Sequence, residues 1–447
     1  MSFESVVDEV RERVVPEPAE VRALEEAIDE LTDRAAAAIE ELPVEADTKL
    51  VGSTARGTWL AGDRDIDIFV RFPPDLDREE LERYGLQVGH AVLPDGHEEF
   101  AEHPYVKGEI DGFDVDCVPC YAIEDPAEIR SAVDRTPFHT AYLEGRVEPV
   151  ADDVRVTKAF LSGIGAYGSD LRTKGFSGFL TELLVVSYGS FRTFIEAAAE
   201  WEPPIRFDPE DHGEKSFDDP LVVVDPTDPN RNVAAVCSPR NVARVIHYAR
   251  ELLADPAIAY FESEAPDPLS ADDIRSRVEK RDTAPIAVRF VAPDIVDDQL
   301  YPQLEKSLDG VEGALKRGGF EPLRSVCFAD GDAVLLVECA VSKLPRVVRH
   351  EGPPVGVKSH AEGFYETYRD DDVTGPFIDE SGRYVVERAR DARTPEALVR
   401  SKLFEVSLGP HIESALSGDY EILTGTEIEA LSDLFGTELA AYFDPEP

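Results

Sequence analysis

The stretch VGSTARGTWLAGDRDIDIFVRF, residues 51–72, decides the fold of the N-terminal part of the chain. Its last eight residues, DIDIFVRF at 65–72, are typical of a β-strand. Side chains alternate between the two faces of a strand, so Asp65 and Asp67 share one face and the neighbouring isoleucines share the other. Like charges that converge in this way need a cation or a proton between them.

A glycine and a serine precede this strand. Gly52 and Ser53 lie where a short predicted strand, TKLVG at 48–52, ends, and they lead into a brief helical piece predicted over residues 55–60. At such a strand-to-helix turn, backbone N–H groups, the serine hydroxyl and the helix dipole can hold a phosphate. Arg56 adds positive charge in the first turn.

A second pair of carboxylates occurs in FDVDCV, residues 113–118. Asp114 and Asp116 share one face of a strand that follows the tight-turn signal Asp111-Gly112. Hard cations such as Mg²⁺ bind through one or two carboxylates plus substrate phosphates, and a further carboxylate would complete a two-metal site. The residues alone leave open which of the two aspartates faces the metals. An exposed alternating strand in so acidic a chain is the alternative without a metal.

The charge of the chain is strongly acidic. Its 447 residues include 45 Lys and Arg against 92 Asp and Glu, which gives a net charge of −47. Such an imbalance normally argues against a nucleic-acid partner. However, the acidic residues are spread along the whole chain, and only 11 of the 45 basic residues are lysines. Both features suit a halophilic host, where molar salt shortens the screening length to roughly 3 Å. The charge therefore says little about the partner.

Cysteine content and hydropathy indicate the compartment. Five cysteines form an odd, sparse set, so a disulfide framework is not expected. Cys117 and Cys120 form a CxxC, which we interpret as two small thiols at a strand end rather than a zinc or redox site. No apolar run reaches the roughly 18 residues of a membrane span. We predict a cytoplasmic protein without a membrane partner.

The pattern of elements predicts an α+β multidomain fold. Strands and helices up to residue 137 form a small α/β domain with helices on a small mixed sheet, and residues 138–257 form a helical central domain. Residues 258–447 form a C-terminal region with a ferredoxin-like βαββ body and a tail.

Several stretches resemble a known family. The pattern of VGSTARGTWLAGDRDIDIFV and FDVDCVPCY is similar to that of the nucleotidyltransferase superfamily, which includes DNA polymerase β and poly(A) polymerases. Residues 130–146, 156–170, 174–191 and 218–235 further resemble the archaeal, class I CCA-adding enzymes, and the likeness becomes thinner beyond residue 235. Such enzymes build the CCA end of tRNA from CTP and ATP without a nucleic-acid template.

The resemblance implies a role for each matching residue. Asp65, Asp67 and Asp116 would bind two Mg²⁺ ions, and Asp116 would also help to activate the tRNA 3′-hydroxyl. The remaining implied contacts are with the nucleotide: Ser53 and Arg56 with its phosphates, His139, Lys158 and Tyr167 with triphosphate and sugar, and Arg231 with the incoming base and tRNA phosphates. The family often has Glu at the position of Asp65 and Asn at that of Gly57, so any side-chain contact at Gly57 is in doubt.

We therefore expect a template-independent tRNA nucleotidyltransferase. Its partners would be CTP, ATP and the acceptor stem and elbow of tRNA, and the sequence leaves a homodimer open. Two alternatives are a poly(A) polymerase-like terminal nucleotidyltransferase, which should reject CTP, and an RNA-binding scaffold that has lost catalysis.

Overall fold

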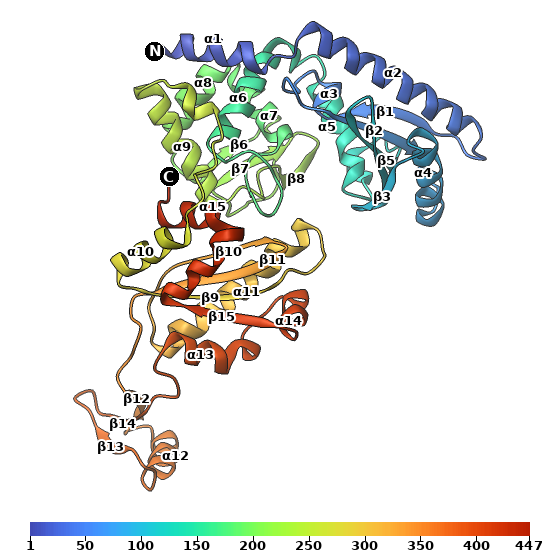
Figure 1. The fold of residues 1–447 in the computed structure, drawn as a ribbon. Coiled ribbons are helices and arrows are strands. Elements are labelled where there is room, and N and C mark those ends of the chain that lie inside the picture. The colour runs from blue at the N-terminus through green and yellow to red at the C-terminus, as the bar shows by residue number, and fades with distance from the viewer. The chain divides into compact units, whose positions relative to one another are not determined.

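The computed structural model describes residues 1–447, which divide into two compact units. The N-terminal unit comprises residues 1–264 together with Pro447, and the C-terminal unit comprises residues 265–446 (Figure 1). None of the helices combines the length and the apolar character that crossing a membrane requires.

The first part of the N-terminal unit is built on a five-stranded mixed sheet. Its strands, in the order in which they pair, are β1 (Asp47–Val51), β2 (Asp65–Phe72), β5 (Phe113–Tyr121), β4 (Pro104–Ile110) and β3 (His97–Phe100). The β2–β5 pair is parallel and the other pairs are antiparallel. This arrangement confirms the predicted mixed sheet.

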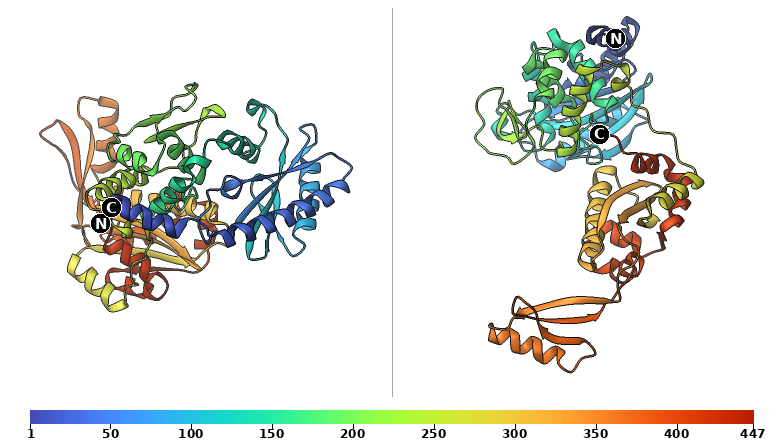
Figure 2. Two further views of the ribbon diagram at one scale, coloured as in Figure 1. Left: turned by 90° about the horizontal axis from the view of Figure 1, so that it is seen from above. Right: turned by 90° about the vertical axis from the view of Figure 1, so that its left-hand side faces the viewer.

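Two helices, α2 (Pro18–Glu40) and α4 (Arg78–Val92), cover one face of this sheet (Figures 1 and 2). Ile66 and Ile68 of β2 are buried in the core that these helices share with the sheet. The predicted alternation along β2 is therefore correct. It leaves Asp65 and Asp67 on the opposite face, which the helices do not cover.

The second part of the N-terminal unit is mainly helical. Its helices are α1 (Phe3–Val14), α5 (Thr136–Leu143), α6 (Ala151–Gly163), α7 (Gly178–Tyr188), α8 (Phe191–Ala199) and α9 (Pro239–Ala254). A small sheet of β6 (Ile205–Phe207), β7 (Leu221–Asp225) and β8 (Asp228–Asn232) accompanies them. The short helix α3 (Gly52–Ala55) belongs instead to the turn between β1 and β2. Four residues of α1 are buried in the core of these helices. The chain therefore begins in the helical part before it forms the mixed sheet, and the domain boundaries at 137 and 257 stay predictions.

The C-terminal unit contains a four-stranded antiparallel sheet. Its strands pair in the order β10 (Pro322–Asp330), β11 (Asp332–Cys339), β9 (Ala284–Val291) and β15 (Tyr420–Thr424). The helices of this body are α10 (Ala271–Arg281), α11 (Asp297–Gly318), α13 (Pro395–Lys402), α14 (Pro410–Leu416) and α15 (Ser432–Phe443). The succession β9–α11–β10–β11 is the predicted βαββ pattern, and β15 supplies the fourth strand of a ferredoxin-like sheet.

The tail forms a separate small sheet with one helix in the same unit (Figure 1). Three short strands, β12 (Val347–Pro354), β14 (Arg383–Ala389) and β13 (Thr374–Ile378), pair in that order, and α12 (Lys358–Tyr368) packs on them. The sequence pattern did not assign these elements.

One local expectation differs from the structure. The helical piece near Arg56 is α3, which begins at Gly52 and ends at Ala55 instead of covering residues 55–60. Helices α7 and α8 are separated at Gly189, whose φ of +84° is left-handed and ends α7. The segment around Asp225 forms the β7–β8 pair, in which the Asn232 side chain accepts a hydrogen bond from the Val223 N–H at 2.8 Å.

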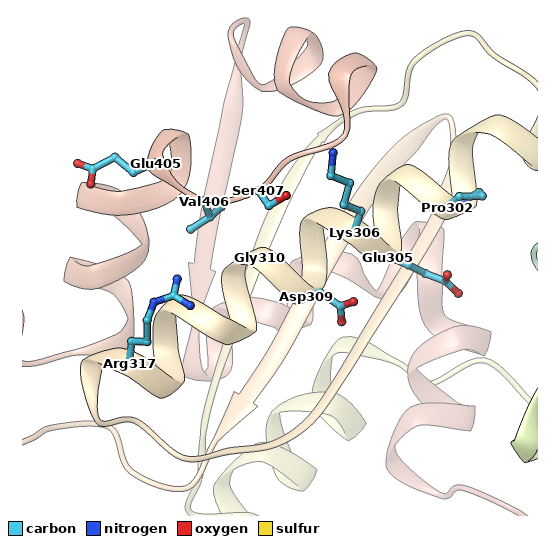
Figure 3. Close-up of a pocket in the computed structure, with 9 residues that line it drawn as sticks. All are labelled: Pro302, Glu305, Lys306, Asp309, Gly310, Arg317, Glu405, Val406 and Ser407. Carbon is cyan, nitrogen blue, oxygen red and sulfur yellow. The ribbon is translucent and has the colours of Figure 1, made fainter. Parts of the chain in front are cut away.

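A pocket of about 560 Å³ lies in the C-terminal unit between α11 and the segment after α13 (Figure 3). Its lining mixes two cations with three carboxylates: Pro302, Glu305, Lys306, Asp309, Gly310, Arg317, Glu405, Val406 and Ser407. It contains none of the residues that the sequence assigns to the nucleotide site.

Candidate active site

Parallel pairing of β2 with β5 brings the two predicted aspartate pairs together. In the register of this pair, Asp67 lies beside Asp116 and Asp65 beside Asp114. All four therefore lie on the sheet face that α2 and α4 leave uncovered. The predicted association of Asp65, Asp67 and Asp116 thus follows from backbone pairing.

The electrostatics of this face disfavour the charged carboxylates. Burial and, to a smaller extent, the charges of Asp116 and Asp65 together raise the pKa of Asp67 to about 6. Burial likewise raises the pKa values of Asp65 and Asp116. The only cation paired with them is Lys107 of β4, whose Nζ is 3.4 Å from Asp116 Oδ1. The cluster therefore carries more negative charge than the protein balances.

The glycine turn lies directly against this cluster. Gly52 has a φ of +77°, and a Cβ at this position would lie 2.2 Å from Asp67 Oδ2. Only glycine leaves room for the carboxylate there. Ser53 follows in α3 and its carbonyl accepts a hydrogen bond from the Thr58 N–H at 2.9 Å. The predicted phosphate turn and the predicted metal ligands are thus neighbours.

The residues present fit a divalent cation. Asp116 Oδ1 is buried and accepts no hydrogen bond, since its contact with Lys107 is an ion pair without hydrogen-bond geometry. No three of these carboxylates lie close enough together in the structure to ligate one ion by themselves. Neighbouring carboxylates with raised pKa values and an unsatisfied buried oxygen are the hard oxygen donors that Mg²⁺ and similar ions take, together with substrate phosphates and water.

A second cluster surrounds Arg56. Its centre is Glu182 of α7, which is completely buried and accepts hydrogen bonds from Arg56 Nε at 2.8 Å and from the Thr58 hydroxyl. Arg56 Nη1 donates to Thr140 Oγ1 at 3.2 Å. Lys158 Nζ donates to the Thr58 carbonyl at 2.9 Å. Two predicted phosphate ligands, Arg56 and Lys158, are thus held by protein groups, and only Nη2 of Arg56 has no protein partner.

The helical part also holds the loop after α3 by its backbone. Arg155 of α6 donates from Nε to the Trp59 carbonyl at 2.9 Å and from Nη2 to the Gly57 carbonyl at 2.6 Å. The position of the loop that carries Arg56 therefore depends on α6 and α7, although this loop connects β1 and β2 of the mixed sheet. Gly57 has no side chain to make the contact left in doubt by the sequence.

Burial controls the titration of the other residues near Arg56. It raises the pKa of Tyr167, whose ring is largely enclosed, and the charge of Glu182 adds to this effect. It lowers the pKa of Lys158 against the opposing influence of Glu182. At neutral pH the Tyr167 hydroxyl is therefore a neutral hydrogen-bond donor.

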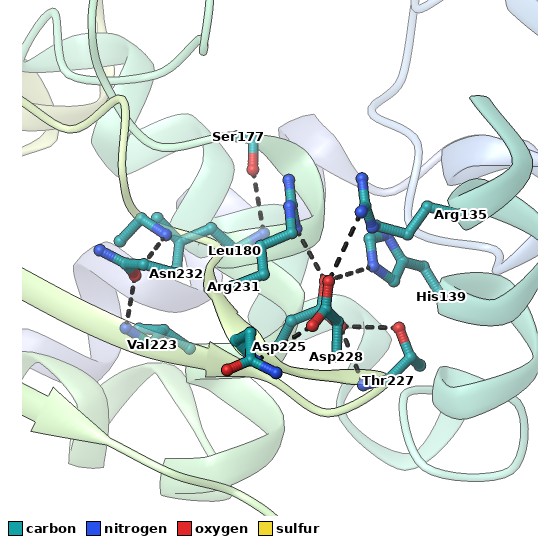
Figure 4. Close-up of polar contacts among 12 residues, drawn as sticks. Arg135, His139, Ser177, Leu180, Val223, Asp225, Thr227, Asp228, Arg231 and Asn232 are labelled. Atoms are coloured by element: carbon teal, nitrogen blue, oxygen red, sulfur yellow. Dashed lines mark hydrogen bonds and ion pairs between the residues drawn. The ribbon is translucent and has the colours of Figure 1, made fainter. Parts of the chain in front are cut away.

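A third cluster contains the last two predicted residues. His139 of α5 and Arg231 of β8 both contact Asp225 at the end of β7 (Figure 4). The structure thus brings His139 and Arg231 together although 92 residues separate them in sequence.

The sequence analysis missed Glu182 and Asp225. Each lies in a run of apolar residues, where an apolar side chain is expected: Glu182 interrupts the helix GFLTELLVVSY, and Asp225 ends the strand LVVVD. A lone carboxylate in a buried run needs a specific partner. That rule could have marked both residues, but it could not have named their partners.

Known families match each part of the chain. A nucleotidyltransferase domain matches residues 33–139, the second domain of tRNA nucleotidyltransferases matches residues 152–262, and the C-terminal domain of CCA-adding enzymes matches residues 281–425. The first match covers β1, β2, β5 and their carboxylates. The N-terminal sheet therefore belongs to a nucleotidyltransferase domain.

Whole proteins match over the full length. A CCA-adding enzyme of Haloarcula marismortui is 57% identical over 463 residues, covering 100% of this chain and 99% of that protein. One of Halobacterium salinarum is 58% identical, with 99% of both chains covered, and one of Methanosarcina acetivorans is 40% identical, with 95% and 94% covered. The likeness to proteins of halophilic archaea agrees with the acidic composition. This chain belongs to the family of CCA-adding enzymes, which are nucleotidyltransferases.

Proposed function

We propose that Asp65, Asp67 and Asp116 carry the template-independent addition of CCA to the 3′ end of tRNA from CTP and ATP. The observation that supports this most strongly is the parallel register of β2 and β5, which sets Asp67 beside Asp116 on the sheet face opposite α2 and α4. The reaction is an attack of the tRNA 3′-oxygen on the α-phosphorus of the nucleotide. The bond from this phosphorus to the pyrophosphate oxygen breaks, and the 3′-hydroxyl loses its proton.

The three aspartates would hold two Mg²⁺ ions. Bound divalent cations would supply a lower pKa for the attacking hydroxyl and neutralise charge on the triphosphate. Asp116, whose buried oxygen accepts no hydrogen bond, is the ligand that we assign to the side of the 3′-hydroxyl. Positioning and electrostatics are then the main contributions of the protein.

The other predicted residues would bind the nucleotide. Ser53 and the backbone of its turn would hold phosphate oxygens, and Arg56 would add its free Nη2. His139, Lys158 and Tyr167 would contact triphosphate and sugar, and Arg231 would contact the base. The C-terminal unit would bind the acceptor stem and elbow of tRNA, mainly by shape. The same proposal includes a cytoplasmic location and a homodimer.

Incorporation of labelled CTP and ATP into tRNA that lacks its last three nucleotides tests this function. At molar KCl with Mg²⁺, we expect two cytidines and one adenosine to be added, after which addition stops. Asp67→Ala should add none. Long adenosine tails would favour the poly(A) polymerase-like alternative, and no incorporation by correctly folded protein would favour the scaffold.

Gly52→Ala tests the contact between the turn and the carboxylate. The new Cβ must displace Asp67 Oδ2, so we expect at least about a 10²-fold loss of kcat/KM, equivalent to about 2.7 kcal/mol. Gly57→Ala is the matched control, because Gly57 also has a positive φ of +63° but nothing lies within 4 Å of its Cβ position. Both variants carry a backbone strain of about 1 kcal/mol. Equal activities of the two variants would contradict the assigned role of Asp67.

A further inference from the structure

Asp225 is a charged residue inside the core of the helical part. It ends β7, a strand of five buried residues, and its own exposed fraction is 0%. A carboxylate without access to water must have its charge balanced by donors. The donors that bond to Asp225 therefore indicate its role.

All the acceptor positions of this carboxylate are occupied. Oδ2 accepts hydrogen bonds from His139 Nε2 at 2.9 Å and from Arg231 Nη1 at 2.7 Å. Oδ1 accepts from the Thr227 N–H at 2.9 Å and from the Thr227 hydroxyl at 2.8 Å. A carboxylate offers about four such positions, so none remains for a ligand. Asp225 therefore acts through the residues that it holds.

The hydrogen bond to Asp225 determines the tautomer of His139. An Nε2 that donates to a carboxylate carries the proton, so the neutral ring presents an unprotonated Nδ1. Burial lowers the pKa of His139, although the hydrogen bond that Nε2 donates to Asp225 opposes this change. The ring also stacks on Phe179, with centroids 3.8 Å apart and planes inclined by 10°. Orientation and tautomer of His139 are thus both fixed, and Nδ1 has no protein partner.

Arg231 is held at one atom and free at the others. Its side chain is 36% exposed, and Nη1 makes its ion pair with Asp225. The next residue, Asn232, fixes the adjoining backbone, because its side chain accepts a hydrogen bond from the Val223 N–H of β7 (Figure 4). It also donates a hydrogen bond to the Leu221 carbonyl. A guanidinium has five N–H donors, so four remain for a ligand.

We propose that Asp225 is a positioning residue that holds His139 and Arg231 at one carboxylate oxygen. It thereby fixes the group that contacts the sugar or triphosphate, His139, relative to the group that contacts the base, Arg231. This inference rests on the proposed function, which assigns both residues to the nucleotide. One carboxylate oxygen then determines the distance between the two groups. Replacing it changes how tightly either nucleotide binds, whereas the carboxylates of β2 and β5 are left untouched.

Asp225→Asn tests this role. The asparagine amide has a single acceptor oxygen, so its NH₂ group must face either the His139 and Arg231 donors or the Thr227 donors. We expect KM for both CTP and ATP to rise about 10- to 100-fold, with kcat within about threefold of the wild type. Asp228→Asn is the matched control on the same hairpin, because Asp228 pairs with Arg135 at 3.5 Å and is partly exposed. It should leave both constants within about twofold.

The tautomer of His139 in the wild-type protein gives a second test, which depends neither on activity nor on the folding of a variant. In ¹⁵N-histidine NMR spectra, with the signal assigned by its loss in His139→Gln, we expect the Nε2-protonated tautomer. The Nδ1-protonated form in the wild type would overturn the proposal, as would an unchanged KM for both nucleotides in folded Asp225→Asn. A wild-type protein that adds no nucleotide would instead refute the proposed function, and the tautomer would still report on Asp225.

Discussion

Asp116→Asn is expected to lower kcat/KM for CTP by about 10³-fold, which corresponds to about 4 kcal/mol of lost transition-state stabilisation. The amide keeps the size of the side chain but removes a charged oxygen ligand beside Asp67. Steady-state addition of one cytidine to tRNA that lacks CCA measures the effect. Folding should be little affected, because Asp116 accepts no hydrogen bond at its buried oxygen and its ion-pair partner Lys107 is 36% exposed.

Asp114→Asn is the control for this prediction. Asp114 lies two residues earlier on β5, beside Asp65, on the same face, but it is exposed. We expect kcat/KM to stay within about threefold of the wild type. The opposite order of effects would mean that Asp114 is the third ligand, a choice that the residues alone left open.

Glu182→Gln is expected to destabilise the N-terminal unit by about 3 to 5 kcal/mol, the range for breaking a buried ion pair from one side. Arg56 and Glu182 are almost wholly buried, with side chains 8% and 0% exposed, and Lys158 is buried nearby. Without the carboxylate, two cations remain in the interior without a counter-charge. Thermal unfolding at constant salt should show Tm lowered by at least about 6 °C for a unit of this size.

Glu196→Gln gives the comparison for an exposed pair. Glu196 pairs with Arg192 one turn away on α8, and both side chains are more than 40% exposed. Such pairs contribute roughly 0 to 1 kcal/mol, so Tm should change little. Equal changes of Tm in the two variants would show that the buried Arg56–Glu182 ion pair does not stabilise the attachment of the Arg56 loop to the helical part.

The sequence predicted the elements that carry the carboxylates because their signals are local. Alternation defined β2, and Asp111-Gly112 marked the hairpin, where both residues adopt the positive φ values of 49° and 80° that this turn needs. The sequence allowed the two aspartate strands to lie side by side but did not require it, and the structure shows β2 and β5 as a parallel pair.

The contacts around Arg56 and Arg231 could not be predicted from the sequence, for a physical reason. Glu182 lies 126 residues from Arg56, and Asp225 lies 86 residues from His139. Hydrophobic periodicity reports which face of an element is buried, but it does not report which distant element packs against that face. The packing of α1 on the helical part and the short strands of the tail were missed for the same reason.

The most direct test of the account is the number of divalent ions that the carboxylates hold. Mn²⁺ binding, followed by electron paramagnetic resonance at molar KCl with saturating CTP and no tRNA, should show two ions for the wild type. Asp67→Asn should lose at least one of them or bind it at least about tenfold more weakly. Equal stoichiometry and affinity in the two proteins would contradict the assignment of Asp65, Asp67 and Asp116 as the metal site.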